Sequence, residues 1–269
     1  MQKYYFKDKV AIITGASSGI GRELAHQLSA LGARLVLAAR DEQRLSDVAE
    51  HCAALGSEVI TVPTDVRDKK QCAALIEQTV DHFHGIDVLI NNAGITMSSE
   101  FALLKDTETL EEIMRVNYFG SMYCTFYALP YLKKSRGMLV GIASLTGKTG
   151  VPTRSGYAAS KHAMAGFFDS LRIELLGSGV SVTMIYPGFV KTEVRERAFG
   201  ADGQPLGQSH LDETQTMPVE TCARLILRTA GKRKRELVMT AKGKIGLWLK
   251  LIAPALVDRI ALKSIRRGR

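Results

Sequence analysis

Cysteine is scarce in this chain, and the few thiols form no recognisable pattern. Cys52, Cys72, Cys124 and Cys222 are dispersed over 269 residues without a C-x-x-C pair. This spacing argues against both a disulfide framework and a zinc site. We therefore expect a protein without a bound metal, from a reducing compartment such as the cytoplasm.

Internal repeats, low-complexity linkers and a long N-terminal apolar stretch are also missing. The first residues run directly into an apolar strand, so the sequence predicts no signal peptide. A length of 269 residues with 46% hydrophobic content fits one large α/β domain. We expect this domain over residues 1–240, followed by an extension over residues 241–269.

Positive charge is concentrated at the C-terminus. The formal net charge is +9, but residues 232–269 hold 12 Lys and Arg against Glu236 and Asp258. The first 231 residues carry 24 basic and 25 acidic residues, so the main body is nearly neutral. A basic tail serves an anionic membrane surface or nucleic acid, or is a solvated end. We expect no nucleic-acid partner.

The same tail contains an apolar segment over residues 245–257. It is too short to span a bilayer, which needs roughly 20 residues, and Pro254 predicts a break or kink within it. The segment must be covered by the domain itself, by a second subunit or by lipid. Flanking basic residues favour peripheral membrane contact through residues 241–269, with a helix packed on a neighbouring subunit as the alternative.

Apolar runs alternate with helical patterns along most of the chain. This alternation predicts a doubly wound, Rossmann-like parallel sheet with helices on both faces, whose ligands bind beyond the carboxyl ends of the strands. The irregular segment 189–217 follows a strand end and predicts a lid or binding loop. The expected strands are residues 10–14, 34–39, 58–62, 87–91, 137–144, 180–186 and 236–239; the expected helices are 20–31, 42–55, 69–83, 110–132, 155–176 and 220–229.

A glycine-rich turn, residues 14–21 (TGASSGIG), joins the first strand to the first helix. Gly15 permits a tight turn, Gly19 lets backbone N–H groups approach a pyrophosphate, and Gly21 lets the helix pack closely on the strand. Phosphates bind well at such a helix N-terminus. This position in a βαβ unit favours dinucleotide binding.

The residues after the second strand bear on which dinucleotide binds. An acidic residue is expected there for a ribose 2′-OH, but the chain has Arg40, with Asp41 only after it. An arginine binds a 2′-phosphate, so the sequence favours NADP(H).

Tyr157 and Lys161 form the most informative pair. Their i, i+4 spacing places both side chains on one face of a helix. A cation beside a phenol lowers its pKa from about 10, so the two residues together could form a proton-transfer device.

With these motifs, the sequence resembles the short-chain dehydrogenase/reductase family from about residue 9 to about residue 239. The resemblance implies a catalytic set of Asn117, Ser144, Tyr157 and Lys161. It implies cofactor contacts from Gly15, Ser17, Ser18, Gly19, Ile20, Gly21, Arg40, Asp65, Val66, Asn92, Ala93, Gly94, Tyr157, Lys161, Pro187, Gly188, Val190 and Thr192.

The family also implies roles for these residues. Tyr157 would protonate the carbonyl oxygen during hydride transfer, Ser144 would hydrogen-bond that oxygen, and Lys161 would lower the Tyr157 pKa and bind the nicotinamide ribose. Asn117 would hold a water molecule linked to Lys161. One departure concerns Ser18, because many NADP-preferring members carry a basic residue there. Only Arg40, helped by Ser17, is then left for the 2′-phosphate.

We expect an NADP(H)-dependent oxidoreductase for a lipophilic ketone or secondary alcohol, hydroxysteroid-like or long-chain, acting as a homodimer or homotetramer. One alternative is a 3-oxoacyl-carrier-protein reductase, whose acidic carrier docks on basic residues. The basic run Lys133, Lys134 and Arg136 is better interpreted as a favourable helix end. The second alternative is a non-catalytic dinucleotide-binding module with a membrane- or nucleic-acid-binding tail.

Overall fold

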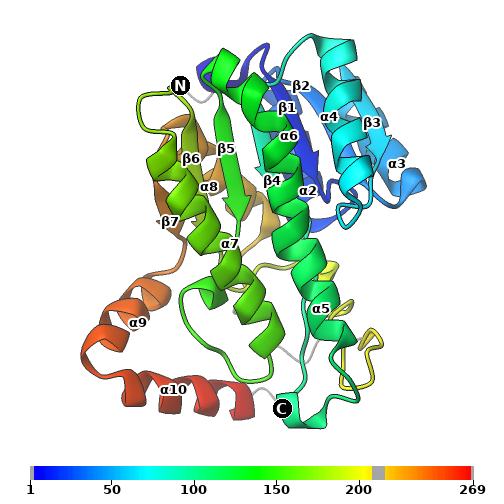
Figure 1. Ribbon diagram of the computed structural model, residues 1–269. Helices are drawn as coiled ribbons and strands as arrows, with labels where there is room; N and C mark the ends of the chain where they lie inside the picture. The colour runs from blue at the N-terminus through cyan, green and yellow to red at the C-terminus, as the bar shows by residue number, and fades with distance from the viewer. Residues whose placement is uncertain (1–2, 208–215, 268–269) are drawn as a thin grey trace.

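A single parallel sheet organises the chain, and helices cover both of its faces (Figure 1). The computed structural model describes residues 3–207 and 216–267. Within these residues, a seven-stranded sheet has the order β3-β2-β1-β4-β5-β6-β7, and all neighbouring strands are parallel. This architecture confirms the predicted doubly wound fold.

The predicted strands and helices are present, with ends that differ by at most three residues. The strands are β1 (Val10–Thr14), β2 (Arg34–Ala39), β3 (Val59–Pro63), β4 (Val88–Asn91), β5 (Met138–Ile142), β6 (Ser181–Tyr186) and β7 (Glu236–Val238). The helices are α1 (Lys3–Phe6), α2 (Gly19–Ala30), α3 (Glu42–Ala54), α4 (Lys69–Phe83), α5 (Glu108–Met114), α6 (Gly120–Ser135), α7 (Ser155–Glu174), α8 (Val219–Gly231), α9 (Ala241–Ile252) and α10 (Pro254–Arg267).

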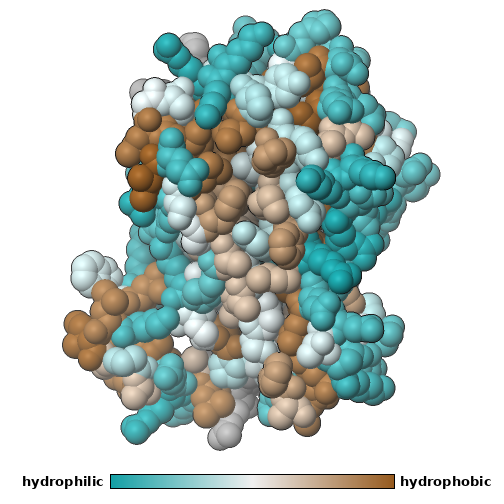
Figure 2. All heavy atoms as spheres, in the orientation of Figure 1, coloured by the Kyte–Doolittle hydropathy of each residue, from teal (hydrophilic) through white to brown (hydrophobic). Residues whose placement is uncertain are grey.

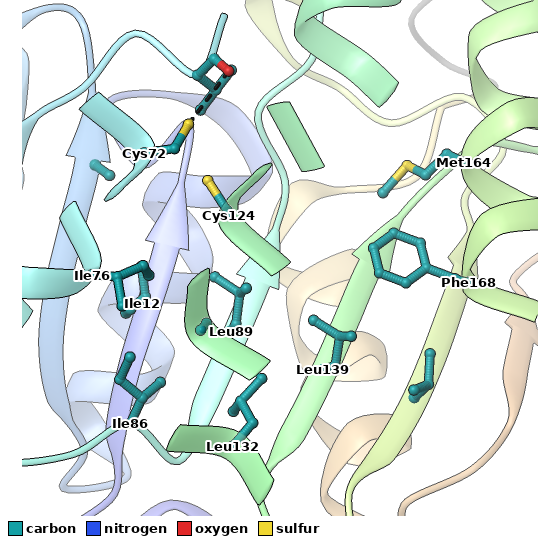
Figure 3. Close-up of a cluster of buried hydrophobic side chains, with 14 of the residues drawn as sticks. Ile12, Cys72, Ile76, Ile86, Leu89, Cys124, Leu132, Leu139, Met164 and Phe168 are labelled. Atoms are coloured by element: carbon teal, nitrogen blue, oxygen red, sulfur yellow. Dashed lines mark hydrogen bonds between the residues drawn. The ribbon is translucent and has the colours of Figure 1, made fainter. Parts of the chain in front are cut away.

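Alternate side chains of each strand enter two separate cores. In β1, Val10 and Ile12 pack on the face covered by α4, α6 and α7. Ala11 and Ile13 pack on the opposite face, under α2, α3 and α8. Figure 3 shows the first core, in which Ile12 lies among side chains from the strands and the covering helices. Burial on both faces explains why β1 and β4 are apolar up to their last residues, Thr14 and Asn91.

Two sequence-based boundaries need correction near the carboxyl ends of the strands. β5 ends at Ile142, so Ser144 lies two residues beyond the strand, at the start of the 3-10 turn η3 (Leu145–Gly147). The helix predicted over residues 110–132 is interrupted by the π-helical turn η2 (Arg115–Phe119) between α5 and α6. A π turn has no hydrophobic period of its own, so the sequence pattern could not reveal it.

The segment predicted as a lid is tied to the loop that follows β4. The backbone N of Phe199 donates to the carbonyl oxygen of Thr96 at 3.0 Å, and the N of Ser98 donates to Phe199 at 2.9 Å. Val190 and Met217 form a bridge that closes the ends of the segment. Residues 208–215 of the predicted lid lie outside the described residues. Its closing over a ligand stays a prediction.

The C-terminal tail forms two helices, α9 and α10, that extend from the carboxyl edge of the sheet (Figure 1). The helices are separated at Pro254, as the sequence predicts. Apolar side chains gather on the surface of α9 (Figure 2), where Trp248 is 71% and Ile252 is 82% exposed. In the described part of the chain, no helix is long and apolar enough to cross a bilayer.

Candidate active site

Glycines shape the turn between β1 and α2. Gly15 and Gly19 have φ values of 65° and 54°, which residues with side chains rarely adopt. A Cβ on Gly21 would lie 2.2 Å from the carbonyl oxygen of Gly15, so only glycine lets the helix approach this turn. The first N–H groups of a helix have no partner within the helix. The turn therefore presents a site suited to an anionic ligand.

Asn92 binds this turn to the end of β4. Its Nδ2 donates to the carbonyl oxygens of Thr14 at 2.9 Å and Gly15 at 3.2 Å. The backbone N–H groups of Asn92 and Ala93 each donate to Oγ1 of Thr14 at 3.0 Å. The ends of β1 and β4 are thus held together where the strand order reverses, which is where ligands bind in this class of sheet.

Basic side chains line the cavity that contains the glycine turn. Arg40, Ser17 and Ser18 line one cavity there. Nη1 of Arg197 lies 3.4 Å from Oγ of Ser18, and Arg197 also forms an ion pair with Glu193. Ser18 precedes α2 without its hydroxyl capping the helix. The guanidinium of Arg197 is therefore close to the hydroxyl of Ser18, and Arg40 and Ser17 line the same cavity.

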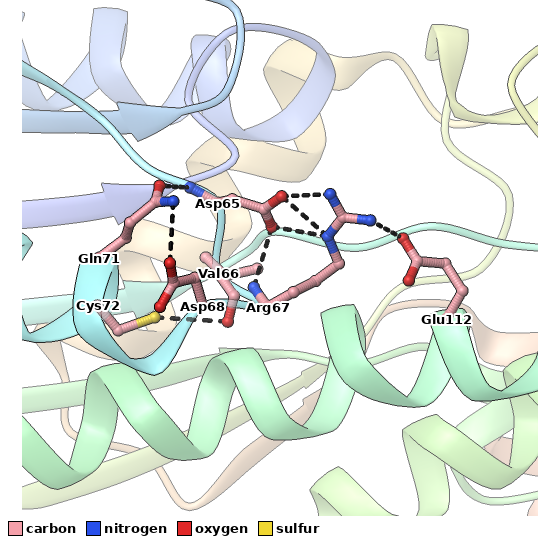
Figure 4. A network of polar contacts seen from close by, with 7 residues as sticks. All are labelled: Asp65, Val66, Arg67, Asp68, Gln71, Cys72 and Glu112. Atoms are coloured by element: carbon pink, nitrogen blue, oxygen red, sulfur yellow. Dashed lines mark hydrogen bonds and ion pairs between the residues drawn. The ribbon is translucent and has the colours of Figure 1, made fainter.

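Asp65 lies in the cavity wall, where its carboxylate is paired with Arg67. Arg67 donates to its carboxylate from Nε at 2.9 Å and also from Nη2, while Nη1 of Arg67 binds Glu112 (Figure 4). Burial alone would raise the pKa of Asp65. The hydrogen bonds and charge of Arg67 outweigh burial and hold the pKa below its ordinary value. The carboxylate is therefore ionised and held in place beside Val66.

Tyr157 lies in the first turn of α7 and hydrogen-bonds Ser144. Burial raises the pKa of the Tyr157 phenol, while the bond with Ser144 and the charge of Arg154 lower it by less. The net pKa lies above the ordinary value. Burial therefore outweighs the two influences that lower this pKa, and the lowering that the family resemblance assigns to Lys161 stays a prediction.

Lys161 lies one turn after Tyr157 and is only 3% exposed. Its Nζ donates to the carbonyl oxygen of Ile142 at 2.9 Å and lies 5.8 Å from the centroid of the Tyr157 ring. Burial lowers the pKa of Lys161 from 10.5 to about 8. The amine is thus mostly protonated at neutral pH and supplies a positive charge beneath the phenol.

Asn117 lies in the π turn and is fully buried. Its Oδ1 accepts from the backbone N of Ile95 at 2.9 Å, and its Nδ2 donates to Ile95 at 3.0 Å and to Ser160 at 2.9 Å. A Cβ on Gly94 would lie 3.2 Å from Oδ1 of Asn117 and 3.4 Å from Nζ of Lys161. Asn117 therefore positions the loop after β4 beside Lys161. Its role in holding a water molecule stays a prediction.

One cavity of about 1500 Å³ joins these residues. Of the catalytic and cofactor-binding residues that the sequence predicts, all line it except Gly21 and Asn117, which lie behind the wall. Parts of the chain that are far apart in sequence, including Gly15, Ser144 and Thr192, therefore meet around a single space.

The structure adds cavity residues that sequence reasoning missed. Arg154 had a detectable signal, since it precedes the predicted catalytic helix by one residue and Tyr157 by three. Arg197 had none, because its approach to Ser18 depends on a distant loop. Four apolar side chains of the tail also line the cavity: Leu247, Val257, Ile260 and Ala261.

Comparison with known proteins gives consistent results. The family model for short chain dehydrogenases matches residues 9–202. A Sesamum indicum protein named 11-beta-hydroxysteroid dehydrogenase A is 38% identical over 256 residues, which are 93% of this chain and 73% of that protein. A Dictyostelium discoideum protein named dehydrogenase/reductase SDR family protein 7-like is 34% identical and is matched over 82% of its length, by 96% of this chain.

Solved structures share the fold. A short-chain dehydrogenase/reductase from Burkholderia phymatum in complex with NAD has a TM-score of 0.82 and 26% identity, over 94% of this chain and 96% of that one. An alcohol dehydrogenase from the archaeon Thermococcus sibiricus, complexed with 5-hydroxy-NADP, has a TM-score of 0.74 and 26% identity. The match covers 86% of this chain and 95% of that one. Since family model, relatives and fold agree, this chain belongs to the short-chain dehydrogenase/reductase family and is an oxidoreductase of CH–OH and C=O groups.

Proposed function

We propose that this protein uses NADP(H) to interconvert a lipophilic ketone and its secondary alcohol, with a hydroxysteroid-like or long-chain lipid as substrate. One observation carries the proposal: a single cavity extends from the glycine turn, past Tyr157, to the helices of the tail. Its volume of about 1500 Å³ exceeds the roughly 300–1,000 Å³ of an ordinary small-molecule site. A dinucleotide and a second ligand therefore fit together.

The substrate end of this cavity is apolar. The tail contributes Leu247, Val257 and Ile260, and the loop after β6 contributes Phe189 and Phe199. Apolar surface removed from water contributes about 25 cal/mol per Å², so such a wall favours a lipophilic ligand. The names of relatives from Sesamum indicum and Arabidopsis thaliana, 11-beta-hydroxysteroid dehydrogenase, support a substrate of this class.

Members of this family bind a nicotinamide dinucleotide, and the residues present fit one. Because the glycines of the turn have no side chains, a ligand can approach the backbone at the N-terminus of α2. The hydroxyl of Ser18 does not cap that helix. Solved relatives hold NAD in one case and an NADP derivative in the other, so the choice rests on Arg40 and Arg197. Guanidinium groups bind phosphates well, so the presence of both side chains in the cavity wall favours a dinucleotide with a 2′-phosphate.

The geometry supports a distinct role in proton transfer to the carbonyl for Tyr157, as the donor, and supporting roles for Ser144 and Lys161. When bound, the reduced nicotinamide supplies the hydride. Tyr157, whose raised pKa keeps the phenol protonated, donates its proton to the carbonyl oxygen. Ser144 donates a hydrogen bond to the same oxygen and holds it beside the phenol. The charge of Lys161 stabilises the phenolate that remains, and in alcohol oxidation Tyr157 accepts the proton instead.

Absorbance of NADPH tests the proposal directly, with steroid, long-chain and acyl-thioester ketones as substrates and NADH as the cofactor control. We expect turnover of steroid or long-chain ketones, with NADPH preferred. Turnover confined to acyl thioesters would instead support a 3-oxoacyl reductase. Absence of turnover with every ketone and both cofactors would contradict the proposed function.

The placement of one basic run weighs against the carrier-protein alternative. Lys133 and Lys134 end α6, and Arg136 lies just before β5 begins. The cavity opens at the other edge of the sheet, where the strands end. This position favours the interpretation of the three basic residues as a stabilised helix end, rather than as a docking site for a carrier protein at the cavity entrance.

We further infer that the exposed face of α9 contacts an anionic lipid surface. Ile245, Trp248 and Ile252 recur at helical spacing on this face and are between 66% and 82% exposed. Lys242 and Lys244 lie beside them and are exposed as well. An apolar face with adjacent cations matches the requirements of an interfacial helix. Homodimer or homotetramer formation, common in this family, stays a prediction.

A further inference from the structure

The apolar surface of the tail continues from the cavity wall to the exterior. Ile260 of α10 lines the cavity that contains Tyr157 and is 53% exposed. Leu256 lies one helical turn earlier on the same face of α10; it is 47% exposed and stands outside the cavity wall. One face of α10 therefore joins the inside of the cavity to the surface of the molecule with apolar side chains.

The loop after β6 adds exposed apolar side chains to the same cavity. Phe189 and Val194 both line the cavity, and both are exposed. Apolar surface left in water costs free energy, which is recovered when an apolar ligand or lipid covers that surface. A cavity lined in this way favours a ligand that arrives from an apolar phase.

The charges of the tail indicate which apolar phase it contacts. Ile245, Trp248 and Ile252 give α9 an exposed apolar face, and apolar side chains cover the outside of this helix in Figure 2. Five of the six charged residues between positions 241 and 263 are cations, and the sixth is Asp258. A second copy of the same tail would bring like charges together, whereas an anionic bilayer complements them.

The two tail helices are held to the domain in different ways. In α9, Nζ of Lys250 donates to the carbonyl oxygen of Lys148 at 3.0 Å, and Leu247 packs against the buried core. Residues 254–263 of α10 form no hydrogen bond or ion pair with any described residue outside the tail. α10 can therefore shift about the break at Pro254 without breaking a polar contact to the domain, which gives a ligand a way in beneath it.

We propose that this protein binds the surface of an anionic bilayer through α9, and that its lipophilic ketone passes from the bilayer into the cavity beneath α10. This inference rests on the proposed function and on the lipid contact of α9, and it adds the source of the substrate. Leu256 and Ile260 provide an apolar path that leads toward Tyr157. Because every methylene group that enters water costs free energy, a long-chain ketone that follows this path avoids the largest barrier to its capture.

Vesicles that carry the ketone test this source with the full-length protein and NADPH. One suspension is phosphatidylcholine alone, and the other contains phosphatidylglycerol as well. The content of a long-chain or steroid ketone is adjusted until centrifugation finds the same aqueous concentration in both. We expect turnover to be about 10-fold or more faster with the anionic vesicles, because a surface-bound protein meets the ketone at a high effective concentration. A short, water-soluble ketone should be reduced equally fast in both suspensions.

Variants then assign the effect to the tail. The ratio of the rates with anionic and neutral vesicles is compared within each protein, so that changes in basal turnover cancel. Replacing Trp248 and Ile252 together with serine should bring this ratio close to one, although neither side chain lines the cavity. Ile173→Ser, at an exposed apolar position on α7, is the matched control and should keep the wild-type ratio.

Four results would overturn the inference. They are a protein that does not bind anionic vesicles; a bound protein whose turnover of the long-chain ketone is no faster; an equal gain for the short ketone, which would mean activation by lipid rather than delivery; and a wild-type ratio in the double variant. A tail-dependent dimer that ignores vesicles would assign the α9 face to a second copy. If ketones are reduced in detergent solution but vesicle charge has no effect, this inference fails alone. If no ketone is reduced under any condition, the proposed function itself fails.

Discussion

The guanidinium of Arg197 lies 3.4 Å from the hydroxyl of Ser18, although 179 residues separate them in the chain. The resemblance to the short-chain dehydrogenase/reductase family implies a basic residue at the position of Ser18 in many NADP-preferring members. The loop after β6 brings the cation of Arg197 beside this position. Under the proposed preference for NADP(H), Arg197 would therefore act together with Arg40 on the 2′-phosphate.

Cofactor preference should respond to both arginines. Arg40→Asp removes a charge-assisted contact and should weaken NADPH binding by about 10- to 100-fold while improving NADH binding. Arg197→Gln should weaken NADPH binding by less, because this side chain is also paired with Glu193. Titration of both variants with NADPH and NADH measures these changes. Equal losses for the two cofactors would argue against a 2′-phosphate site.

Removal of the Tyr157 hydroxyl should stop chemistry without preventing cofactor binding. Tyr157→Phe lacks the proton donor, so we expect kcat to fall by about 10²- to 10⁴-fold. NADPH affinity should stay within a few-fold of the wild-type value, which separates this effect from unfolding. Turnover at the wild-type rate would show that another group delivers the proton.

Lys161 should make stability depend on pH. Its pKa is about 8 in the folded protein, against 10.5 as the reference value for the unfolded chain. Between these values the unfolded state binds one more proton, so the free energy of unfolding contributed by this group rises with pH. The shift corresponds to about 3 kcal/mol. Below pH 8 the buried charge lowers the free energy of unfolding by this amount, and the loss disappears by about pH 10.5.

Urea unfolding of the wild-type protein and Lys161→Met at pH 7.5 and pH 10.5 isolates this contribution. Other titrating groups, including Tyr157, are present in both proteins and largely cancel in the comparison. The wild-type protein should gain stability relative to the variant at the higher pH. The same pH dependence in both proteins would mean that Lys161 titrates at its ordinary pKa.

The close approach at Gly21 should be intolerant of a side chain. A Cβ there would lie 2.2 Å from the carbonyl oxygen of Gly15 and 2.5 Å from Nδ2 of Asn92. We expect Gly21→Ala to destabilise the protein by about 1–3 kcal/mol and to weaken dinucleotide binding, because the turn must move.

Gly166 provides a matched control for this substitution. It lies within α7, and a Cβ there would have no neighbour within 4 Å. Gly166→Ala should stabilise the helix by about 0.5–1 kcal/mol, because alanine loses less backbone entropy on folding. Thermal melts of both variants give the comparison. Similar effects from the two substitutions would refute the close-packing argument.

Lipid contact should depend on the exposed face of α9. Replacing Trp248 and Ile252 together with serine removes two large apolar side chains, each worth about 1.5–3 kcal/mol when buried. Co-sedimentation with anionic liposomes should therefore weaken by about 100-fold or more. Ile173→Ser, at an apolar position on α7 that is 67% exposed, should leave binding unchanged. Altered oligomer mass with unaltered liposome binding would assign the α9 face to a subunit contact instead.

Most of the fold followed from local patterns. Alternating apolar runs located the strands because both faces of a parallel sheet are buried, as in β1 and β4. The prediction failed where geometry departs from a regular period. Ser144 follows a strand that ends at Ile142, and the π turn that carries Asn117 interrupts a helix whose apolar spacing is otherwise continuous.

The sequence by itself determined the glycine turn and the pairing of Tyr157 with Lys161, because both depend on spacing within one or two helical turns. Tertiary structure alone decided the charges around them. Burial, which depends on what packs against a residue, raises the Tyr157 pKa and lowers that of Lys161. Long-range packing likewise brings Arg197 to Ser18. It also places four apolar side chains of the tail, including Leu247 and Ile260, at the wall of the cavity that contains Tyr157.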